Sequence, residues 1–177
     1  MHRAVRLIHY LREELLRGAS SWEMFSYQRS PGFGFLAQDA PQKRSMNYWL
    51  YYYFNRHAGR WVLGIDGTAP YHEGAASGRA YRGPLTPMVA TLSADEQQLY
   101  LIVANGSWQQ TVPAQVTLRG LVPRHGTGVV LSHADPDGDP FLNRRDELVH
   151  DLEIEIQGAQ LTAKLPPHSV AFLTIQE

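Results

Sequence analysis

The chain has 177 residues, of which 44% are hydrophobic and 19% charged, and its formal net charge is −1. This near-neutral balance argues against a nucleic acid or a membrane surface as a partner bound through charge. The sequence has no cysteine, which excludes disulfide bonds and thiol chemistry. No apolar run approaches the roughly 20 residues that cross a bilayer, and the N-terminus is too charged for a secretory signal. We therefore expect a cytoplasmic protein, or one whose targeting signal lies outside this sequence.

The first element that the pattern predicts is a helix over residues 2–17. Its apolar side chains recur at helical spacing: Ala4, Ile8, Leu11 and Leu15. Gly18 is expected to end this helix. Residues 20–27 follow as a strand whose large side chains do not alternate, which predicts that both faces are buried, as in a parallel sheet covered by helices. A loop rich in glycine and proline comes next.

The strongest pattern in the sequence is an aromatic helix that begins after Ser45, a good N-cap, and stops at Gly59. Six side chains fall on one helical face: Met46, Trp49, Leu50, Tyr53, Phe54 and His57. Three more tyrosines, Tyr48, Tyr51 and Tyr52, cover most of the other face. A helix that is apolar nearly all round must be covered on more than one side.

From residue 60 onward the pattern is that of β-structure. A long glycine-rich loop is expected over residues 67–84. Short strands are expected at residues 61–65, 88–92, 99–103, 115–118, 128–131, 152–156, 161–165 and 169–175. Strands of this length, separated by turn signals, predict an antiparallel β-sandwich.

The chain is therefore expected to have two unlike parts, an α/β unit over residues 1–59 and an antiparallel β-sandwich over residues 60–177. The first part contains one strand without a partner in its own part of the chain, and 60 residues are too few for a parallel sheet. This favours the last unit of a larger α/β architecture. The alternative is that the two helices simply cap the sandwich.

Three segments resemble those of a known family. Residues 99–107 (LYLIVANGS) are similar to a strand followed by Asn-x-Ser in the C-terminal domain of family 51 α-L-arabinofuranosidases. Residues 165–170 (LPPHSV) resemble the start of that domain's closing strand. The strand at Trp22, the loop and a helix ending at residues 54–59 (FNRHAG) resemble the eighth β/α unit of a clan A glycoside hydrolase barrel. Families 39, 30 and 44 share this layout.

The resemblance implies a mainly β fold, in which a helix–strand–helix remnant of a (β/α)8 barrel precedes the sandwich. It also implies that the two catalytic glutamates lie on barrel strands 4 and 7, upstream of this chain. No residue here is expected to be catalytic, whether the chain is an enzyme stays open, and no cofactor is expected. The chain would then be a non-catalytic accessory region of a hydrolase that acts on arabinoxylan or arabinan.

Two other functions remain open beside this one. The first is a free-standing β-sandwich that binds carbohydrate, and the second is an interaction module that completes a barrel in trans. In each case we expect the exposed flank of the α/β part to drive self-association, or contact with an N-terminal barrel.

Five residues are candidate sugar contacts. Trp22 could form a stacking floor on the last barrel strand, and Glu23 could touch substrate near the active site. The alternatives are core packing for Trp22 and a hydrogen-bonded or outward-facing carboxylate for Glu23. Tyr71, Tyr81 and Trp108 could stack on sugar rings, or they could be partly buried anchors of their loops.

A weak calcium motif lies at Asp135, Asp137 and Asp139, whose alternate spacing lets three carboxylates converge on a hard cation. Asp146 stands at the twelfth place of the motif, but Pro140 occupies the sixth, where an EF-hand needs glycine. An acidic turn is the alternative. None of the eight histidines has the spacing of a metal-binding motif. We therefore expect no metal site.

Overall fold

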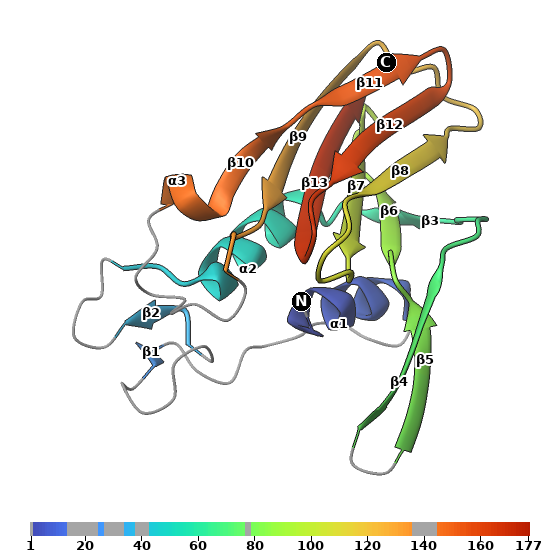
Figure 1. Cartoon of the computed structure of the whole chain (residues 1–177). Helices are drawn as coiled ribbons and strands as arrows, with labels where there is room; N and C mark the ends of the chain where they lie inside the picture. Colours follow the sequence, from blue (N-terminus) through green and yellow to red (C-terminus); the bar gives the residue numbers. More distant parts are fainter. Residues whose placement is uncertain (1, 14–24, 27–33, 38–42, 77–78, 136–144) are drawn as a thin grey trace.

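The computed structural model of the protein describes residues 2–13, 25–26, 34–37, 43–76, 79–135 and 145–177. Its middle layer is an antiparallel sheet in the order β10-β9-β13-β7-β6-β3 (Figure 1). The strands of this sheet are β3 (Trp61–Leu63), β6 (Met88–Leu92), β7 (Gln98–Asn105), β9 (His125–Leu131), β10 (Val149–Leu152) and β13 (Ser169–Gln176). A second antiparallel sheet, in the order β11-β12-β8, covers one face of it. Its strands are β8 (Val112–Thr117), β11 (Ile154–Gln157) and β12 (Gln160–Leu165).

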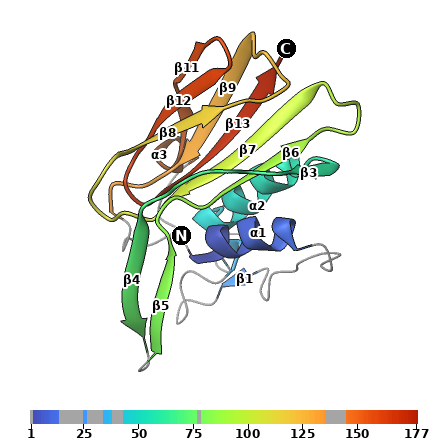
Figure 2. The same cartoon turned by 90° about the vertical axis from the view of Figure 1, so that its right-hand side faces the viewer.

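Two helices, α1 (His2–Arg12) and α2 (Met46–His57), cover the other face of the middle sheet (Figure 2). One apolar core lies between the two sheets and a second lies between the middle sheet and the helices. The predicted fold class, a mainly β chain built on an antiparallel sandwich, is confirmed. The second core contains residues from both predicted parts of the chain. The division into two parts at residue 59 remains a prediction, and so does the expectation that the first part belongs to a barrel.

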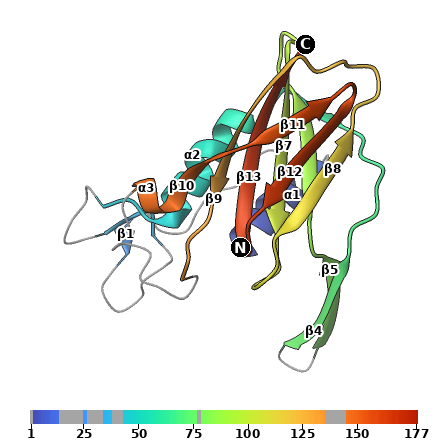
Figure 3. The same ribbon diagram turned by 45° about the horizontal axis from the view of Figure 1, so that its top comes forward.

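Helix α2 has the start and the buried face that its sequence predicts. The Ser45 hydroxyl accepts a hydrogen bond from the Tyr48 amide at 3.3 Å and donates one to the carbonyl oxygen of Gly34 at 2.8 Å. Five of the six residues on the predicted face are buried: Trp49, Leu50, Tyr53, Phe54 and His57. The helix lies along the middle sheet (Figure 3), and its remaining tyrosines are partly buried against the same core.

The end of α2 shows a different use of glycine from the one expected. The helix ends at His57, and Ala58 is its C-cap. Gly59 follows with no positive φ, but a β-carbon there would overlap the carbonyl oxygen of Leu92. Glycine is therefore required because the chain passes directly against the backbone of β6.

Helix α1 is shorter than predicted. It ends at Arg12, and the amide of Glu13 donates to the carbonyl oxygen of Tyr10 at 3.2 Å, which is the tighter bonding of a final turn. Ala4, Leu7 and Ile8 form its buried face. The rest of the predicted helix, from residue 14 to residue 17, lies outside the described residues.

The predicted strand at residues 20–27 is described only at β1 (Phe25–Ser26). It pairs in parallel with β2 (Leu36–Ala37), and Phe25 lies opposite Leu36. The expectation of a strand without a partner in its own part of the chain is therefore wrong. The partner was missed because β2 is two residues long and lies within a stretch rich in loop-forming residues.

The prediction of a long loop over residues 67–84 is also wrong. This stretch contains a hairpin of β4 (Tyr71–Ala76) and β5 (Arg79–Pro84), which projects away from the two sheets (Figure 1). This hairpin is held by its backbone ladder and has few β-branched or alternating apolar side chains, so it gives no strand signal in the sequence.

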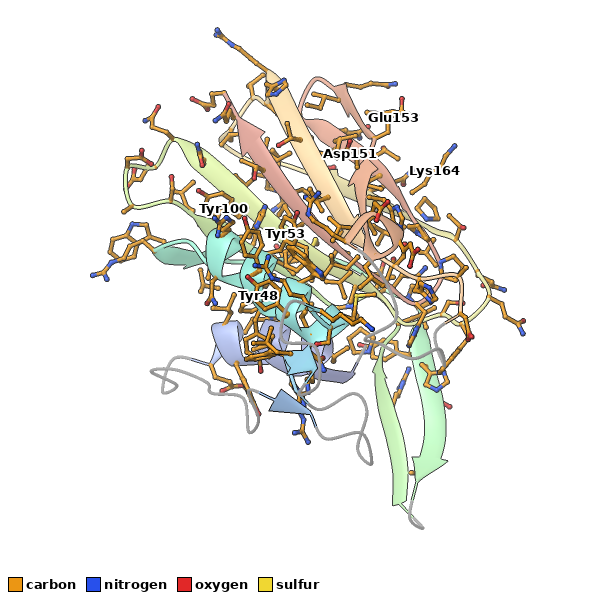
Figure 4. The ribbon with its side chains drawn as sticks, turned by 90° about the vertical axis from the view of Figure 1, so that its left-hand side faces the viewer. Tyr48, Tyr53, Tyr100, Asp151, Glu153 and Lys164 are labelled. Atoms are coloured by element: carbon orange, nitrogen blue, oxygen red, sulfur yellow. The ribbon has the colours of Figure 1, made fainter. Side chains whose placement is uncertain are left out.

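The strand predicted at residues 152–156 is in fact two strands. The chain leaves the middle sheet at the end of β10 and enters the outer sheet at the start of β11, with Glu153 between them (Figure 4). A short helix, α3 (Arg145–Leu148), precedes β10 and was not predicted. Within the described ranges, no helix combines the length and the hydropathy needed to span a membrane.

Candidate functional site

The structure describes only part of the set of predicted site residues. Trp22, Glu23, Asp137 and Asp139 lie outside the described residues, so their predicted roles stay predictions. The backbone of Tyr81 belongs to β5, but its side chain is not among those that the structure describes. Tyr71, Trp108 and Asp135 are the three whose side chains can be placed.

Tyr71 and Trp108 are brought to the same end of the middle sheet by backbone hydrogen bonds. At the foot of the hairpin, the Leu85 amide donates to the carbonyl oxygen of Pro70 at 2.7 Å. The amide of Gly106 then donates to the carbonyl oxygen of Leu85 at 2.8 Å. Tyr71 follows Pro70, and Trp108 lies two residues after Gly106, so both aromatic residues extend from one hydrogen-bonded junction.

The indole of Trp108 stacks on the imidazole of His168, with ring centroids 4.4 Å apart and an interplanar angle of 16°. His168 has a φ of 50°, in the left-handed region that residues other than glycine seldom occupy. Its amide donates to the carbonyl oxygen of Ser107 at 2.7 Å, which fixes this conformation. Trp108 nevertheless remains 57% exposed, so the pairing with His168 orients the indole without burying it.

Asn105, at the end of β7, holds the loop beneath this pair. Its side-chain amide, which is fully buried, donates to the carbonyl oxygens of Gln110 at 2.8 Å, Leu165 at 3.1 Å and Pro166 at 2.8 Å. Its side-chain oxygen accepts from the Ser107 amide at 2.9 Å. The loop after β7 is therefore tied to the turn before β13, and one buried side-chain amide holds the two segments that carry the Trp108–His168 stack.

Tyr71 is 59% exposed, and its ring has a charged neighbour. The guanidinium carbon of Arg82 lies 4.3 Å from the ring centroid, and the Arg82 side chain forms an ion pair of 3.2 Å with Glu73. Both charged side chains are exposed, so this pair contributes little to stability. The two charges of the pair offset each other beside Tyr71, and Arg79 adds one further positive charge to the hairpin.

We name Tyr71, Trp108, His168, Gln109 and Gln110 the aromatic end surface. It combines exposed ring faces with the amides of Gln109 and Gln110, whose residues are exposed. Such a set can stack on a flat ligand and form hydrogen bonds with hydroxyl groups. Sequence reasoning missed His168, because the resemblance placed it in a strand-opening motif and its role depends on a backbone angle.

Within the described ranges, every aspartate and glutamate is exposed. The general acid of a glycoside hydrolase is a carboxyl in an apolar, buried setting, paired with a second carboxyl. None of the carboxyl groups that can be placed has that setting. No group of three or more His, Asp or Glu side chains in the described part could hold a metal ion. A calcium site at Asp135 would also need Asp137 and Asp139, so the calcium motif stays a prediction.

The imidazole of His57 is buried between α2 and the middle sheet, with its ring centroid 6.4 Å from that of Tyr53 and 5.5 Å from that of Tyr100. Both tyrosines are labelled in Figure 4. The Nδ1 atom of His57 donates to the carbonyl oxygen of Tyr53 at 2.7 Å, and its Nε2 atom lies 3.3 Å from the hydroxyl of Thr174. Burial lowers the pKa of His57, and the positive charge of Arg56 lowers it further. This imidazole is enclosed by the core and serves packing.

Comparison with solved structures finds enzymes with a similar fold. The family 51 α-L-arabinofuranosidase of Thermotoga petrophila RKU-1 matches with a TM-score of 0.59 at 14% identity, over 73% of this chain and 28% of that chain. The chain resembles part of a family 51 arabinofuranosidase. A second arabinofuranosidase matches with a TM-score of 0.54 at 15% identity, over 68% and 27% of the two chains. For the Thermotoga maritima α-L-arabinofuranosidase, in complex with arabinose, the TM-score is 0.51 at 15% identity, over 69% and 27%.

The predicted resemblance is thus confirmed at the level of fold, and the chain is glycoside-hydrolase-like in architecture. The chain spans between 21% and 28% of the length of the arabinofuranosidases that it matches. No family model matches the sequence, and no curated protein matches it.

Proposed function

We propose that the chain is a non-catalytic accessory region of a glycoside hydrolase, in which it braces a catalytic barrel. The observation that carries this proposal is the attachment of α2 to the sandwich. The hydroxyl of Thr91 on β6 donates to the carbonyl oxygen of His57 at 2.8 Å and accepts from the Gly59 amide at 2.9 Å. The end of the helix is therefore bonded to the sheet as well as packed on it.

The same helix packs its buried rings on β13. The ring centroid of Phe172 lies 5.7 Å from that of Tyr53 and 5.3 Å from that of His57. Such rings bury large apolar areas and interlock in few arrangements. A helix held in this way is a firm support for whatever packs on its other side.

The opposite side of α2 offers a surface for that contact. Tyr48 and Tyr52 are only partly buried, and their rings stack with centroids 6.3 Å apart. The guanidinium carbon of Arg44 lies 4.7 Å from the Tyr48 ring centroid, and that of Arg56 lies 3.9 Å from the Tyr52 ring centroid. Tyrosine and arginine are enriched where proteins meet. We propose this side of α2 as the face that meets the barrel.

The whole enzyme would act on an arabinose-containing plant polysaccharide, of the arabinoxylan or arabinan class. This part of the proposal is supported by the fold likeness to arabinofuranosidases. The chain itself would supply no acid–base pair, which is consistent with the exposed setting of every carboxyl group that the structure places.

Hydrolysis of 4-nitrophenyl α-L-arabinofuranoside by the purified chain tests the non-catalytic role. We expect no release of nitrophenol above the buffer rate. Turnover that disappears in a Glu23→Gln variant would show that the chain is itself a catalyst. The genomic DNA upstream of the Met1 codon tests the accessory role. We expect it to encode barrel strands with two glutamates, and an unrelated upstream gene would contradict that role.

A further inference from the structure

We propose that the aromatic end surface binds a neutral oligosaccharide, with the exposed face of the Trp108 indole as its stacking platform. The choice of a sugar as ligand rests on the proposed function, whereas the existence of a built platform rests on the geometry alone. The platform follows the end of β7 and shares no residue with the face of α2 proposed to meet the barrel.

The platform is built before any ligand arrives. His168 adopts a backbone conformation that is unfavourable for a residue with a side chain, and in it the imidazole lies parallel to the indole. Asn105 ties both loops together from below. Because the indole is already oriented, little conformational freedom is lost when a flat ligand stacks on it. A strained residue that supports an exposed ring is the kind of feature that accompanies binding sites.

The polar groups around the indole suit hydroxyl groups. Gln109 and Gln110 follow Trp108 directly, and both are exposed. An amide side chain both donates and accepts hydrogen bonds, as does a sugar hydroxyl. The hydroxyl of Ser107 accepts hydrogen bonds from the backbone amides of both glutamines, at 3.4 Å and 3.0 Å, so the backbone that carries these side chains is ordered.

The side chains that follow the indole favour a neutral ligand. Trp108 is followed by two uncharged amides, and beside Tyr71 the charges of Arg82 and Glu73 offset each other, while Arg79 adds one positive charge to the hairpin. No large exposed apolar side chain other than Tyr71 and Trp108 extends from this junction, among the residues that the structure describes. A protein partner would call for a broader apolar patch. Single rings set among amides fit a sugar better.

The chain supplies a matched control for the platform. Trp61, on β3, is 51% exposed and is therefore as accessible as Trp108. It pairs with Leu92, which in turn pairs with Leu99 at the beginning of β7, whereas Trp108 follows the end of that strand. The two tryptophans are thus separated by most of the length of β7, about 20 Å at the usual rise per residue.

Isothermal titration calorimetry of the full chain tests the platform, with a linear arabino-oligosaccharide and a xylo-oligosaccharide as neutral probes and an oligogalacturonide as the anionic one. We expect saturable binding of a neutral probe that added salt does not weaken. Truncation of a central aromatic contact typically costs roughly tenfold or more in affinity, so Trp108→Ala should weaken binding by that factor. Trp61→Ala should leave it unchanged.

A His168→Gly variant tests the stack without changing the loop. It removes the imidazole, and glycine accepts the positive φ of this position. We expect weaker neutral-sugar binding at an unchanged unfolding midpoint. The proposal is overturned if the wild-type chain binds neither neutral probe, if Trp108→Ala binds as well as wild type, or if only the oligogalacturonide binds. A chain that binds no sugar and hydrolyses no arabinofuranoside would refute the platform alone. Hydrolysis lost in Glu23→Gln would refute the non-catalytic role instead.

Discussion

The side-chain amide of Asn105 donates a hydrogen bond to the carbonyl oxygen of Pro166 at 2.8 Å, across 61 positions of the sequence. Asn105 belongs to the segment at residues 99–107 and Pro166 to the segment at residues 165–170, the two sandwich segments on which the expected resemblance to arabinofuranosidases rests. The two segments therefore meet in space. Their meeting has a physical basis, because a buried amide must find acceptors and here the second segment provides them.

Replacing Asn105 should unfold the corner that it ties. Asn105→Ala removes the donor to three carbonyl oxygens and the acceptor for the Ser107 amide, so the bonds that tie the two loops together are lost, although the Pro166 carbonyl oxygen still accepts from the Ser169 hydroxyl at 2.7 Å. We expect a loss of about 2–4 kcal/mol in the free energy of unfolding, measured by urea denaturation. Asn105→Asp should be worse, since it directs a carboxylate at carbonyl oxygens.

A matched control is Gln109→Ala in the same loop, whose side chain is exposed. Its effect on unfolding should stay within about 0.5 kcal/mol. Equal stability of Asn105→Ala and Gln109→Ala would show that the buried amide does not hold the corner.

Gly59 should be intolerant of even a single added carbon. A β-carbon there would overlap the backbone of Leu92, and backbone cannot move aside as a flexible side chain can. Gly59→Ala should therefore lower the free energy of unfolding by about 1–3 kcal/mol, as overpacking does. Gly64 has nothing within 4 Å of the same atom, so Gly64→Ala is the control and should be nearly neutral. Similar unfolding midpoints for the two variants would argue against this close approach.

The sequence predicted those elements whose side chains alternate or recur regularly. The buried face of α2 follows a helical period, and the strands of the two sheets carry short apolar runs, so both could be recognised. The hairpin of β4 and β5 could not, because backbone pairing leaves no mark on its small and charged side chains. The change of sheet at Glu153 was hidden for a related reason: alternation continues through it, although the chain changes partners there.

The candidate site was predicted only in part, and the reason is again physical. Trp108 could be singled out, since a tryptophan in a polar loop is unusual enough to notice. Its partner His168 could not, because the stack depends on a positive φ and on a hydrogen bond to Ser107. The junction between Pro70, Leu85 and Gly106 consists of backbone groups, which any sequence possesses.

Thr91 should contribute more through its hydroxyl than through its volume. The hydroxyl donates to the His57 carbonyl and accepts from the Gly59 amide, so Thr91→Val leaves both groups unpaired at nearly constant shape. We expect a loss of about 1–3 kcal/mol in the free energy of unfolding, and faster hydrogen exchange at the Gly59 amide. Thr91→Ser keeps the hydroxyl and should therefore preserve both hydrogen bonds. Thr127→Val, at an exposed position of β9, is the control, and equal losses in the two valine variants would refute the bond.

His57 should make the stability of the protein depend on pH. Burial lowers its pKa in the folded chain below the value of about 6.5 that it has when unfolded. The unfolded state therefore binds more protons between these two pKa values, and stability falls as the pH falls through that range. Above pH 6.5 or so, the full contribution is present. Urea midpoints measured over a pH series should decrease accordingly toward acid.

His57→Gln should flatten the dependence of stability on pH, because glutamine does not titrate. It should also lower the free energy of unfolding by about 1–3 kcal/mol, through lost ring packing and hydrogen bonding. The exposed His125 on β9 gives the matched variant, His125→Gln, which should keep the wild-type fall toward acid. If His57→Gln and wild type lose the same free energy of unfolding between neutral and acid pH, the buried imidazole does not titrate in this range. The acid sensitivity of the fold must then originate in another group.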